Sequence, residues 1–268
     1  MNRHRTAAVL VLAFGFLVTG RSFACDTDNA EVICGLTNAE DLFRLPGTPW
    51  VIASHINFDF SSDPPRPAGL GPVEIVRIET HHVQRLYPRP DSAVDWDRKM
   101  YPDCSAPPEN IGLAGLNARP LGKNKFRLYL TNHGGRESVE IVDLAIQGEK
   151  LRTTWRGCVR SPQYVWPNSV APLPGDGFVL SGNEAAIWRP GQGWTKVAGY
   201  VAEYSNGVEV SRDGKWIFIA NAGQVLRVPV AGGTVESVRA TADNLRWGED
   251  GYLYVVAEPQ TRTRSPLP

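Results

Sequence analysis

Three asparagines, each at the start of a strand-like segment, recur every 38 residues: Asn168, Asn206 and Asn244. An aspartate, Asp243, directly precedes the last of them. A hard cation such as calcium takes roughly 6 to 8 oxygen ligands, and amide and carboxylate oxygens both serve. Polar oxygens at one repeated position therefore predict a shared cation site, provided that the fold brings the repeats together.

A second repeat indicates what positions these side chains. Three turn glycines recur every 37 residues: Gly177, Gly214 and Gly251. Asp-Gly turns precede strand-like segments rich in β-branched and aromatic residues, at 178–180, 216–220 and 252–257. Further strands are expected at 50–53, 126–131, 139–144, 185–188 and 225–230. Self-similarity at this period favours an all-β propeller with antiparallel meander blades, whose equivalent loops converge at a central channel. A β-sandwich is the alternative, but it does not require the asparagine spacing to hold twice.

Taken one at a time, the polar residues have a simpler interpretation. Asn206-Gly207 and Asp243-Asn244 are residue pairs that commonly form turns, because they tolerate left-handed backbone and bond their own main chain. Only their shared position in the repeat favours a metal.

Composition excludes several classes of protein. The chain has 268 residues, 42% of them apolar, and 28 basic residues balance 28 acidic ones. It is large enough for a sizeable core, and it has no basic field to attract nucleic acid. Between residues 61 and 108 prolines are dense and the strand pattern weakens, so we expect a blade that carries an insertion with long loops there.

The N-terminus resembles an export signal, with basic residues at positions 3 and 5, an apolar run from Ala7 to Val18, and a cleavage site after Ala24. The apolar run is about 12 residues, short of the roughly 20 that span a bilayer. We therefore expect residues 1–24 to be a signal peptide and residues 25–268 to be an exported propeller domain, periplasmic or secreted. A lipoprotein anchored at Cys25 is the less favoured alternative.

Export permits disulfides, and the four cysteines allow three pairings. Joining Cys104 to Cys158 would attach a Pro-rich loop to the body of the domain, and four free thiols are the alternative. The cysteines lack CxxC pairs, so zinc is not expected.

Several segments together resemble the paraoxonase/arylesterase family, which is related to the gluconolactonase and strictosidine synthase-like six-bladed propellers. The resemblance runs from about residue 34 to residue 258 and rests on these segments: Ala39-Glu40-Asp41-Leu42, Leu45-Pro46-Gly47, Leu130-Thr131-Asn132-His133, Pro167-Asn168, Ser205-Asn206-Gly207, Ser211-Arg212-Asp213-Gly214-Lys215 and Ala242-Asp243-Asn244.

The resemblance implies a catalytic calcium held by five side chains: Glu40, Asn168, Asn206, Asp243 and Asn244. Glu40 joins the set mainly through the family, and with Asp243 it would balance a divalent charge. The resemblance also implies a second, structural calcium at Asp41 and the carbonyl of Leu116, where this chain has Ser169 in place of a third ligand, an aspartate. The second site thus lacks one carboxylate.

Family members hydrolyse lactones and aryl esters, with calcium polarising the carbonyl and a histidine pair helping to activate water. His133 matches one histidine, but Ala114 stands where the other is expected, and alanine cannot accept a proton. His81 and His82 are adjacent in an expected strand, where they would point to opposite faces. His133 is therefore the one catalytic candidate.

Three functions follow as hypotheses. The first is a calcium-dependent hydrolase of a small lactone or aryl ester, and the second is a calcium-stabilised propeller that binds without turnover. A non-hydrolytic, strictosidine synthase-like reaction on the same fold is the third.

Family members continue beyond the Asp-Asn pair for most of another blade, whereas residues 258–268 show no strand pattern. We expect about five blades with the last one incomplete, because of a truncated sequence or of a partner that completes the ring.

Overall fold

The computed structural model describes residues 33–36, 38–59, 61, 66–203 and 205–256. The chain divides into two units, residues 1–34 and residues 35–268. Of the first unit only residues 33 and 34 are described, so the expected signal peptide and Cys25 lie outside the described residues. Every strand among the described residues belongs to the second unit. Among the described residues there is no helix that could span a membrane.

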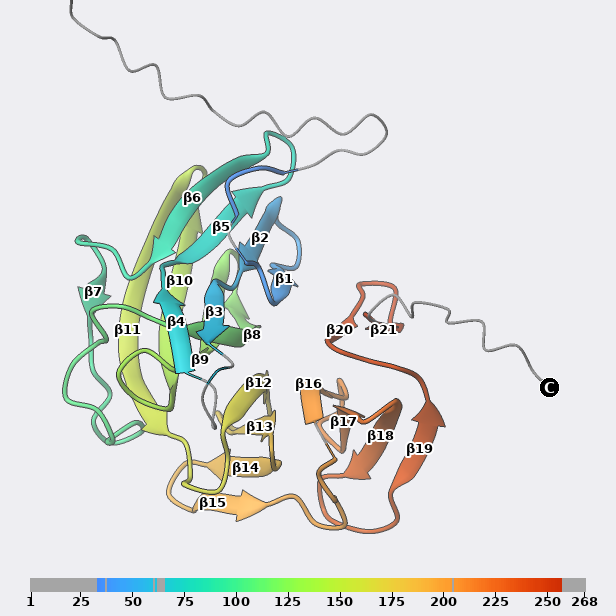
Figure 1. Cartoon of the computed structure of the whole chain (residues 1–268). Helices are drawn as coiled ribbons and strands as arrows, with labels where there is room; N and C mark the ends of the chain where they lie inside the picture. The colour runs from blue at the N-terminus through green and yellow to red at the C-terminus, as the bar shows by residue number, and fades with distance from the viewer. Residues whose placement is uncertain (1–32, 37, 60, 62–65, 204, 257–268) are drawn as a thin grey trace, which may run out of the picture. The chain divides into compact units, whose positions relative to one another are not determined.

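Four antiparallel sheets follow one another along the chain as the blades of a β-propeller (Figure 1). The first blade consists of β1 (Leu42–Arg44), β2 (Trp50–Ala53), β5 (Val73–Arg77) and β6 (His82–Tyr87). The second consists of β8 (Leu113–Gly122), β9 (Lys125–Asn132), β10 (Ser138–Gln147) and β11 (Lys150–Arg160), and β7 (Ala93–Val94) pairs in parallel with β11.

The third blade consists of β12 (Pro167–Pro172), β13 (Phe178–Gly182), β14 (Ala186–Arg189) and β15 (Gly193–Lys196). The fourth consists of β16 (Ser205–Val210), β17 (Trp216–Asn221), β18 (Gln224–Pro229) and β19 (Glu236–Arg239). A two-stranded sheet, β20 (Leu245–Trp247) and β21 (Leu253–Val255), follows them. The predicted all-β propeller with antiparallel meander blades is confirmed.

The segment from 61 to 108 carries the expected insertion. A separate hairpin, β3 (Ile56–Asp59) and β4 (Arg66–Leu70), lies between the second and third strands of the first blade. The same segment also supplies β5, β6 and β7, which the proline-rich pattern concealed. The prediction that His81 lies in a strand is wrong: its φ of 55° places it in left-handed backbone, and β6 begins at His82.

The repeated glycines do not all form the same turn. Gly214 and Gly251 have φ values of +70° and +88°, which glycine adopts without strain, and each lies between the two strands of an antiparallel pair. Gly177 is not in this region. There Asp176 takes the positive φ of 62°, and a Cβ at Gly177 would lie 2.8 Å from the carbonyl oxygen of Trp188. Close packing, rather than turn geometry, explains the glycine at 177.

The hydrophobic core lies between neighbouring blades. Trp50 of the first blade and Trp155 of the second share one buried cluster, and Tyr129 and Phe178 join the second blade to the third. A further cluster, which includes Val208, joins the third blade to the fourth. Each blade thus buries its faces against its neighbours, which is how a propeller repeat is stabilised.

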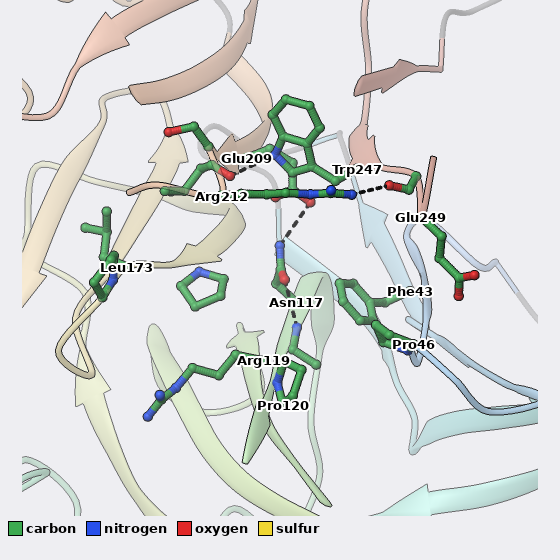
Figure 2. A pocket seen from close by; sticks show the side chains of 16 residues that line it. Phe43, Pro46, Asn117, Arg119, Pro120, Leu173, Glu209, Arg212, Trp247 and Glu249 are labelled. Atoms are coloured by element: carbon green, nitrogen blue, oxygen red, sulfur yellow. Dashed lines mark hydrogen bonds between the residues drawn. The ribbon is translucent and has the colours of Figure 1, made fainter. Parts of the chain in front are cut away.

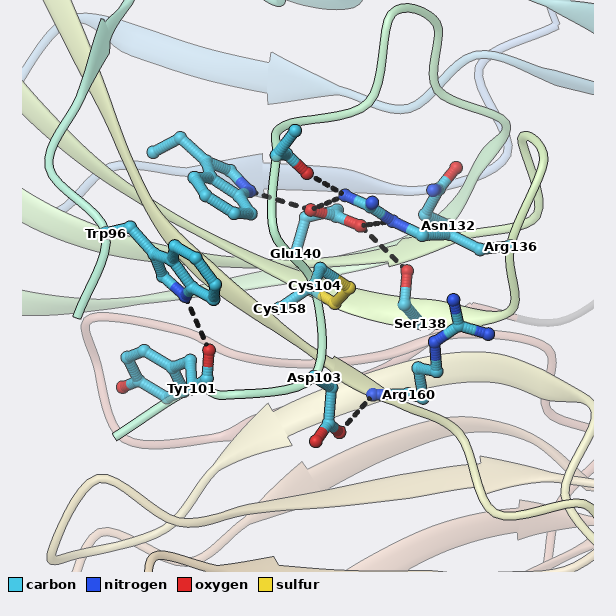
Figure 3. The surroundings of a disulfide bond; sticks show 12 residues. Trp96, Tyr101, Asp103, Cys104, Asn132, Arg136, Ser138, Glu140, Cys158 and Arg160 are labelled. Atoms are coloured by element: carbon cyan, nitrogen blue, oxygen red, sulfur yellow. Dashed lines mark hydrogen bonds and ion pairs between the residues drawn. A yellow bond between two sulfur atoms is a disulfide. The ribbon is translucent and has the colours of Figure 1, made fainter. Parts of the chain in front are cut away.

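A disulfide joins Cys104 to Cys158, so of the three possible pairings the structure contains the one that attaches the Pro-rich loop to β11 (Figure 3). Beside it lies the buried carboxylate of Glu140. Arg136 holds this carboxylate with two nitrogens at 2.8 and 2.9 Å, and Ser138 and Trp155 each donate to it at 2.8 Å. Because the sulfurs are bonded to each other and the carboxylate is fully hydrogen-bonded, this group is structural.

Candidate metal centre

The innermost strands of successive blades approach one another closely at the end where the repeated asparagines lie. A Cβ on Gly115 of β8 would lie 2.5 Å from the carbonyl oxygen of Asn168 on β12. A Cβ on Gly207 of β16 would lie 2.7 Å from the Cα of Asn244, which directly precedes β20. Both contacts are with backbone, which cannot move aside as a flexible side chain can. Glycine at these two positions therefore lets the inner strands converge and carries the asparagines to one end of the channel.

Hydrogen bonds fix the same convergence. The Thr131 hydroxyl donates to the carbonyl of Asn168 at 3.3 Å, and the Ser181 hydroxyl donates to the carbonyl of Asn206. The Asn244 amide donates to the carbonyl of Glu40 at 3.0 Å, which joins the last inner strand to the first. The predicted side chains thus lie at the same end of adjoining inner strands.

Four of the five predicted ligands carry a buried oxygen that has no hydrogen-bond partner among the described residues. These atoms are Glu40 Oε2, Asn168 Oδ1, Asn206 Oδ1 and Asn244 Oδ1. Buried polar atoms are rarely left unsatisfied in proteins, since each costs about 1–3 kcal/mol. All four are side-chain carboxylate or amide oxygens. An oxygen-binding cation would satisfy the whole set, so the residues present fit the calcium that the sequence predicts.

The fifth predicted ligand supplies negative charge. Asp243 Oδ1 accepts a hydrogen bond from the Asn206 amide at 2.5 Å, which leaves the Asn206 oxygen as the free atom of that side chain. Burial, together with the Asp41 and Asp243 carboxylates, raises the pKa of Glu40 to about 8, against smaller opposing effects of Asn244 and Arg246. Carboxylates gathered in this way repel one another unless a proton or a cation is present.

Ser54 fixes the backbone that carries Glu40 and Asp41. Its hydroxyl accepts hydrogen bonds from the backbone nitrogens of Glu40, at 3.1 Å, and Asp41, at 2.7 Å. The turn before β1 is thereby fixed. Glu40 keeps an unpartnered oxygen at the asparagine end, whereas both carboxylate oxygens of Asp41 are hydrogen-bonded.

His133 lies at the end of β9 within an aromatic group. Its ring centroid is 5.0 Å from that of Trp166 and 5.4 Å from that of Phe58, and its side chain is 0% exposed. Nδ1 is 2.6 Å from a carboxylate oxygen of Glu137, and Nε2 has no partner among the described residues. Trp166 is two residues from Asn168, so the imidazole lies at the asparagine end of the molecule.

Ala114 occupies the second inner strand, beside Gly115, and is 1% exposed. It stands in β8 where Asn206 stands in β16, since each precedes the glycine that packs against the next inner strand. The second blade therefore offers no polar side chain at the position that carries an asparagine in the third and fourth blades. The five expected metal ligands and His133 thus lie at the same end of the inner strands, and position 114 holds no second histidine.

Sequence reasoning missed a buried charged group one layer further along the channel. Arg246 of β20 contacts Asp41, the carbonyl of Leu116, and Glu209 of β16. Burial raises the pKa of Glu209 to about 7, although Arg246 and the Asn117 amide act to lower it. A charged residue in the middle of an apolar inner strand, as in Val208-Glu209-Val210 and Leu245-Arg246-Trp247, was the available signal.

A pocket of about 540 Å³, shown in Figure 2, lies next to this charged group, since Glu209 is one of its lining residues. The later residues of the inner strands line it, including Asn117, Glu209 and Trp247, together with Phe43 and Leu173. Because the asparagines stand at the beginning of the same strands, the pocket and the asparagines are at opposite ends of the channel. The charged group separates them.

The fold and the site define this chain as a β-propeller with an oxygen-rich end to its channel. No family model matches the sequence, and no curated protein matches it. Solved structures that resemble it include a chain of a nidogen/laminin complex, which is 11% identical with a TM-score of 0.42 and matches over 71% of this chain and 59% of that one.

Two other solved structures have the names of enzymes. A glucose dehydrogenase-like oxidoreductase from Thermus thermophilus is 14% identical with a TM-score of 0.40, over 85% of this chain and 93% of that one. A 6-phosphogluconolactonase-like protein from Bacteroides uniformis is 13% identical with a TM-score of 0.40, over 83% of this chain and 78% of that one. Likenesses this distant carry no argument about the reaction.

Proposed function

We propose that this protein is an exported, calcium-dependent hydrolase of lactones or aryl esters, similar to the paraoxonase/arylesterase family. The observation that supports it most is the set of four buried oxygens without partners among the described residues, which belong to four of the ligands that the sequence predicts. A structural turn would bond its own backbone and leave no such atoms. Their shared position at the channel end is typical of a ligand site.

Calcium bound there would polarise an ester or lactone carbonyl and lower the pKa of a bound water. The chain itself contributes the ligand oxygens, two negative charges from Glu40 and Asp243, and an orientation set by the Asn206–Asp243 hydrogen bond. His133 is the group that would accept the proton of the attacking water, because its Nε2 has no other partner among the described residues and a carboxylate oxygen of Glu137 lies 2.6 Å from its Nδ1.

The alternative is a calcium-stabilised propeller that binds a ligand without turnover. Two observations favour it: Ala114 supplies no second base, and the aromatic rings of Phe58 and Trp166 pack against His133 as they would against a core residue. Both proposals share the cation, and they differ in what His133 does.

The test is hydrolysis of a panel of lactones and phenyl esters by the full chain, in calcium and in chelator. We expect turnover that requires calcium, that Asn168→Ala abolishes, and that Asn110→Ala, at an exposed asparagine, leaves intact. His133→Gln should reduce kcat about 100-fold with little effect on calcium affinity.

Calcium binding without turnover in the wild type would favour the scaffold. In that case Ala114→His separates the two proposals, provided that its melting temperature shows that the buried site accepts the larger side chain. A gain in turnover would indicate an enzyme that has lost a base, and no gain would leave the scaffold.

A further inference from the structure

Arg246 occupies a position surrounded by oxygen atoms from other inner strands. Its Nη2 donates to Asp41 Oδ2 and, at 2.6 Å, to the carbonyl of Leu116. Its Nε donates to the carbonyl of Leu42 at 3.0 Å, and its Nη1 donates to Glu209 Oε1 at 3.3 Å. One guanidinium therefore joins β20 to β1, β8 and β16.

Two of these acceptors are buried carboxylates. Asp41 is 3% exposed and Glu209 is 6% exposed, and the remaining acceptors are backbone carbonyls. Two carboxylates and two carbonyls form the kind of oxygen set that would otherwise bind a metal ion. A planar group with five N–H donors satisfies the same oxygens by hydrogen bonding and supplies one positive charge.

A metal ion and the guanidinium cannot both occupy this set. Even with both carboxyl groups ionised, Asp41 and Glu209 carry two negative charges, so a divalent ion beside Arg246 would place three positive charges against two in a buried volume. Ser169 on β12 adds no compensating charge, because its buried side chain is a neutral hydroxyl. The residues at this layer therefore do not fit the second, structural calcium that the family resemblance implies.

We propose that Arg246 is the structural cation of this layer, in place of a second metal ion, and that the protein binds one calcium ion, at the asparagine end. The count of one rests on the proposed function, whereas the role of Arg246 does not. By joining the last inner strand to the first two, Arg246 also holds the strands at the distance that the asparagine end requires.

The first experiment counts calcium ions bound per full chain, by equilibrium dialysis after chelation. We expect one ion. Two ions would overturn the role of Arg246 and leave the proposed function standing, whereas no ion would overturn the proposed function. In that last case the role of Arg246 is decided by the melting experiment below.

Adjacent acidic residues provide a matched pair of variants. Asp41→Asn should leave the count at one and change the calcium affinity less than about 10-fold, since Asp41 serves the guanidinium. Glu40→Gln should lower the affinity more than about 10-fold, since Glu40 would be a ligand. If the wild type bound two ions and Asp41→Asn bound only one, the proposal would be overturned.

The second experiment measures the melting temperature in chelator. Arg246→Met should lower it by about 10 °C or more, because two buried carboxylates lose their cation, and Arg239→Met, at an exposed arginine of β19, should leave it within about 2 °C. Arg246→Lys, which keeps the charge without the planar fork, should fall between them.

The Met variant should also gain more from millimolar calcium than the wild type does, because the vacated oxygen set can then bind an ion. A melting temperature of Arg246→Met equal to that of the wild type would overturn the proposal. Should Arg246→Met not fold, the double variant Arg246→Met/Glu209→Gln, which buries one carboxylate fewer, should recover folding, and a double variant no better than the single would count against it.

Discussion

Replacing Asn206 by aspartate should make this protein less stable without calcium and more responsive to calcium. In the wild type the Asn206 amide nitrogen donates to Asp243 Oδ1 at 2.5 Å, and Asn206 Oδ1 has no partner among the described residues. The substitution keeps the oxygen and turns the donating nitrogen into a second oxygen facing a carboxylate. A metal site and a purely structural asparagine respond to this change in opposite ways.

The magnitude follows from the geometry. Two carboxylates about 3 Å apart repel by about 5 kcal/mol at an effective dielectric constant of about 20. Partial exposure of both side chains reduces this value, and the lost hydrogen bond to a charged group adds about 1.5–3 kcal/mol. A net loss of ~4 kcal/mol lowers the melting temperature of a chain of this size by roughly 10 °C.

Calcium should reverse most of this loss. At a concentration about 100 times Kd, an ion that binds only the folded state adds about 2.7 kcal/mol to the stability of the wild type, or roughly 5–10 °C. In Asn206→Asp the ion also removes the carboxylate repulsion, so the calcium-induced rise should exceed that of the wild type by several degrees. The assay is thermal unfolding followed by tryptophan fluorescence in calcium, in magnesium and in chelator.

Asn221→Asp is the matched control in the same blade. Asn221 Oδ1 accepts from the nitrogen of Glu203 and the hydroxyl of Ser205, and its Nδ2 donates to the carbonyl of Val201. Both polar atoms of Asn221 are already hydrogen-bonded. Asn221→Asp should therefore lower the melting temperature of the protein by the same amount in calcium as in chelator. A calcium-induced rise in Asn206→Asp no larger than that of the wild type would refute the metal site.

Three further outcomes are expected. Gly207→Ala should cost about 1–3 kcal/mol of stability in urea unfolding and weaken calcium binding, because the added Cβ would lie 2.7 Å from the backbone of the next inner strand. Gly69→Ala is the control, since its Cβ would lie 3.4 Å from a side chain, and it should cost less stability. Removing the Cys104–Cys158 bond, which closes a separation of 54 residues, should cost ~4 kcal/mol in the same assay. The raised pKa of Glu209 stabilises the protonated folded state below the unfolded value of 4.5, and this contribution is lost as the pH rises through about 7. Relative to the wild type, Glu209→Gln should therefore gain roughly 3 kcal/mol between about pH 4.5 and pH 8, measured by unfolding across that range.

The sequence predicted the parts of the fold that repeat. Asn168 and Asn206 lie in the inner strands β12 and β16, and Asn244 directly precedes β20, because a fixed spacing in the chain becomes a fixed position in each blade. The strand expected at 50–53 matches β2. The proline-rich segment had a weaker signal, since edge strands and an inserted hairpin do not need the alternation that a half-buried strand shows.

The candidate site could be predicted from spacing only where its residues share a repeat position. Arg246 and Glu209 come from different blades, and they meet because the inner strands converge, which no periodicity in the chain records. Asp41 illustrates the same limit. The sequence places it beside Glu40, but only the folded structure shows that both of its oxygens are already hydrogen-bonded, to the nitrogens of Leu42 and Leu116 and to Arg246.

The polar residues of the repeat are more informative about function than its small and apolar residues. A propeller needs small residues and apolar faces at equivalent positions, and those explain Gly115 and Gly207 without reference to any ligand. Folding alone does not explain amide oxygens in successive blades that are buried and without a partner among the described residues, since alanine at the same place, as at Ala114, is buried without that cost. If these oxygens serve a ligand, replacing all three asparagines by alanine should cost less stability in chelator than the loss of their side-chain hydrogen bonds alone would cost.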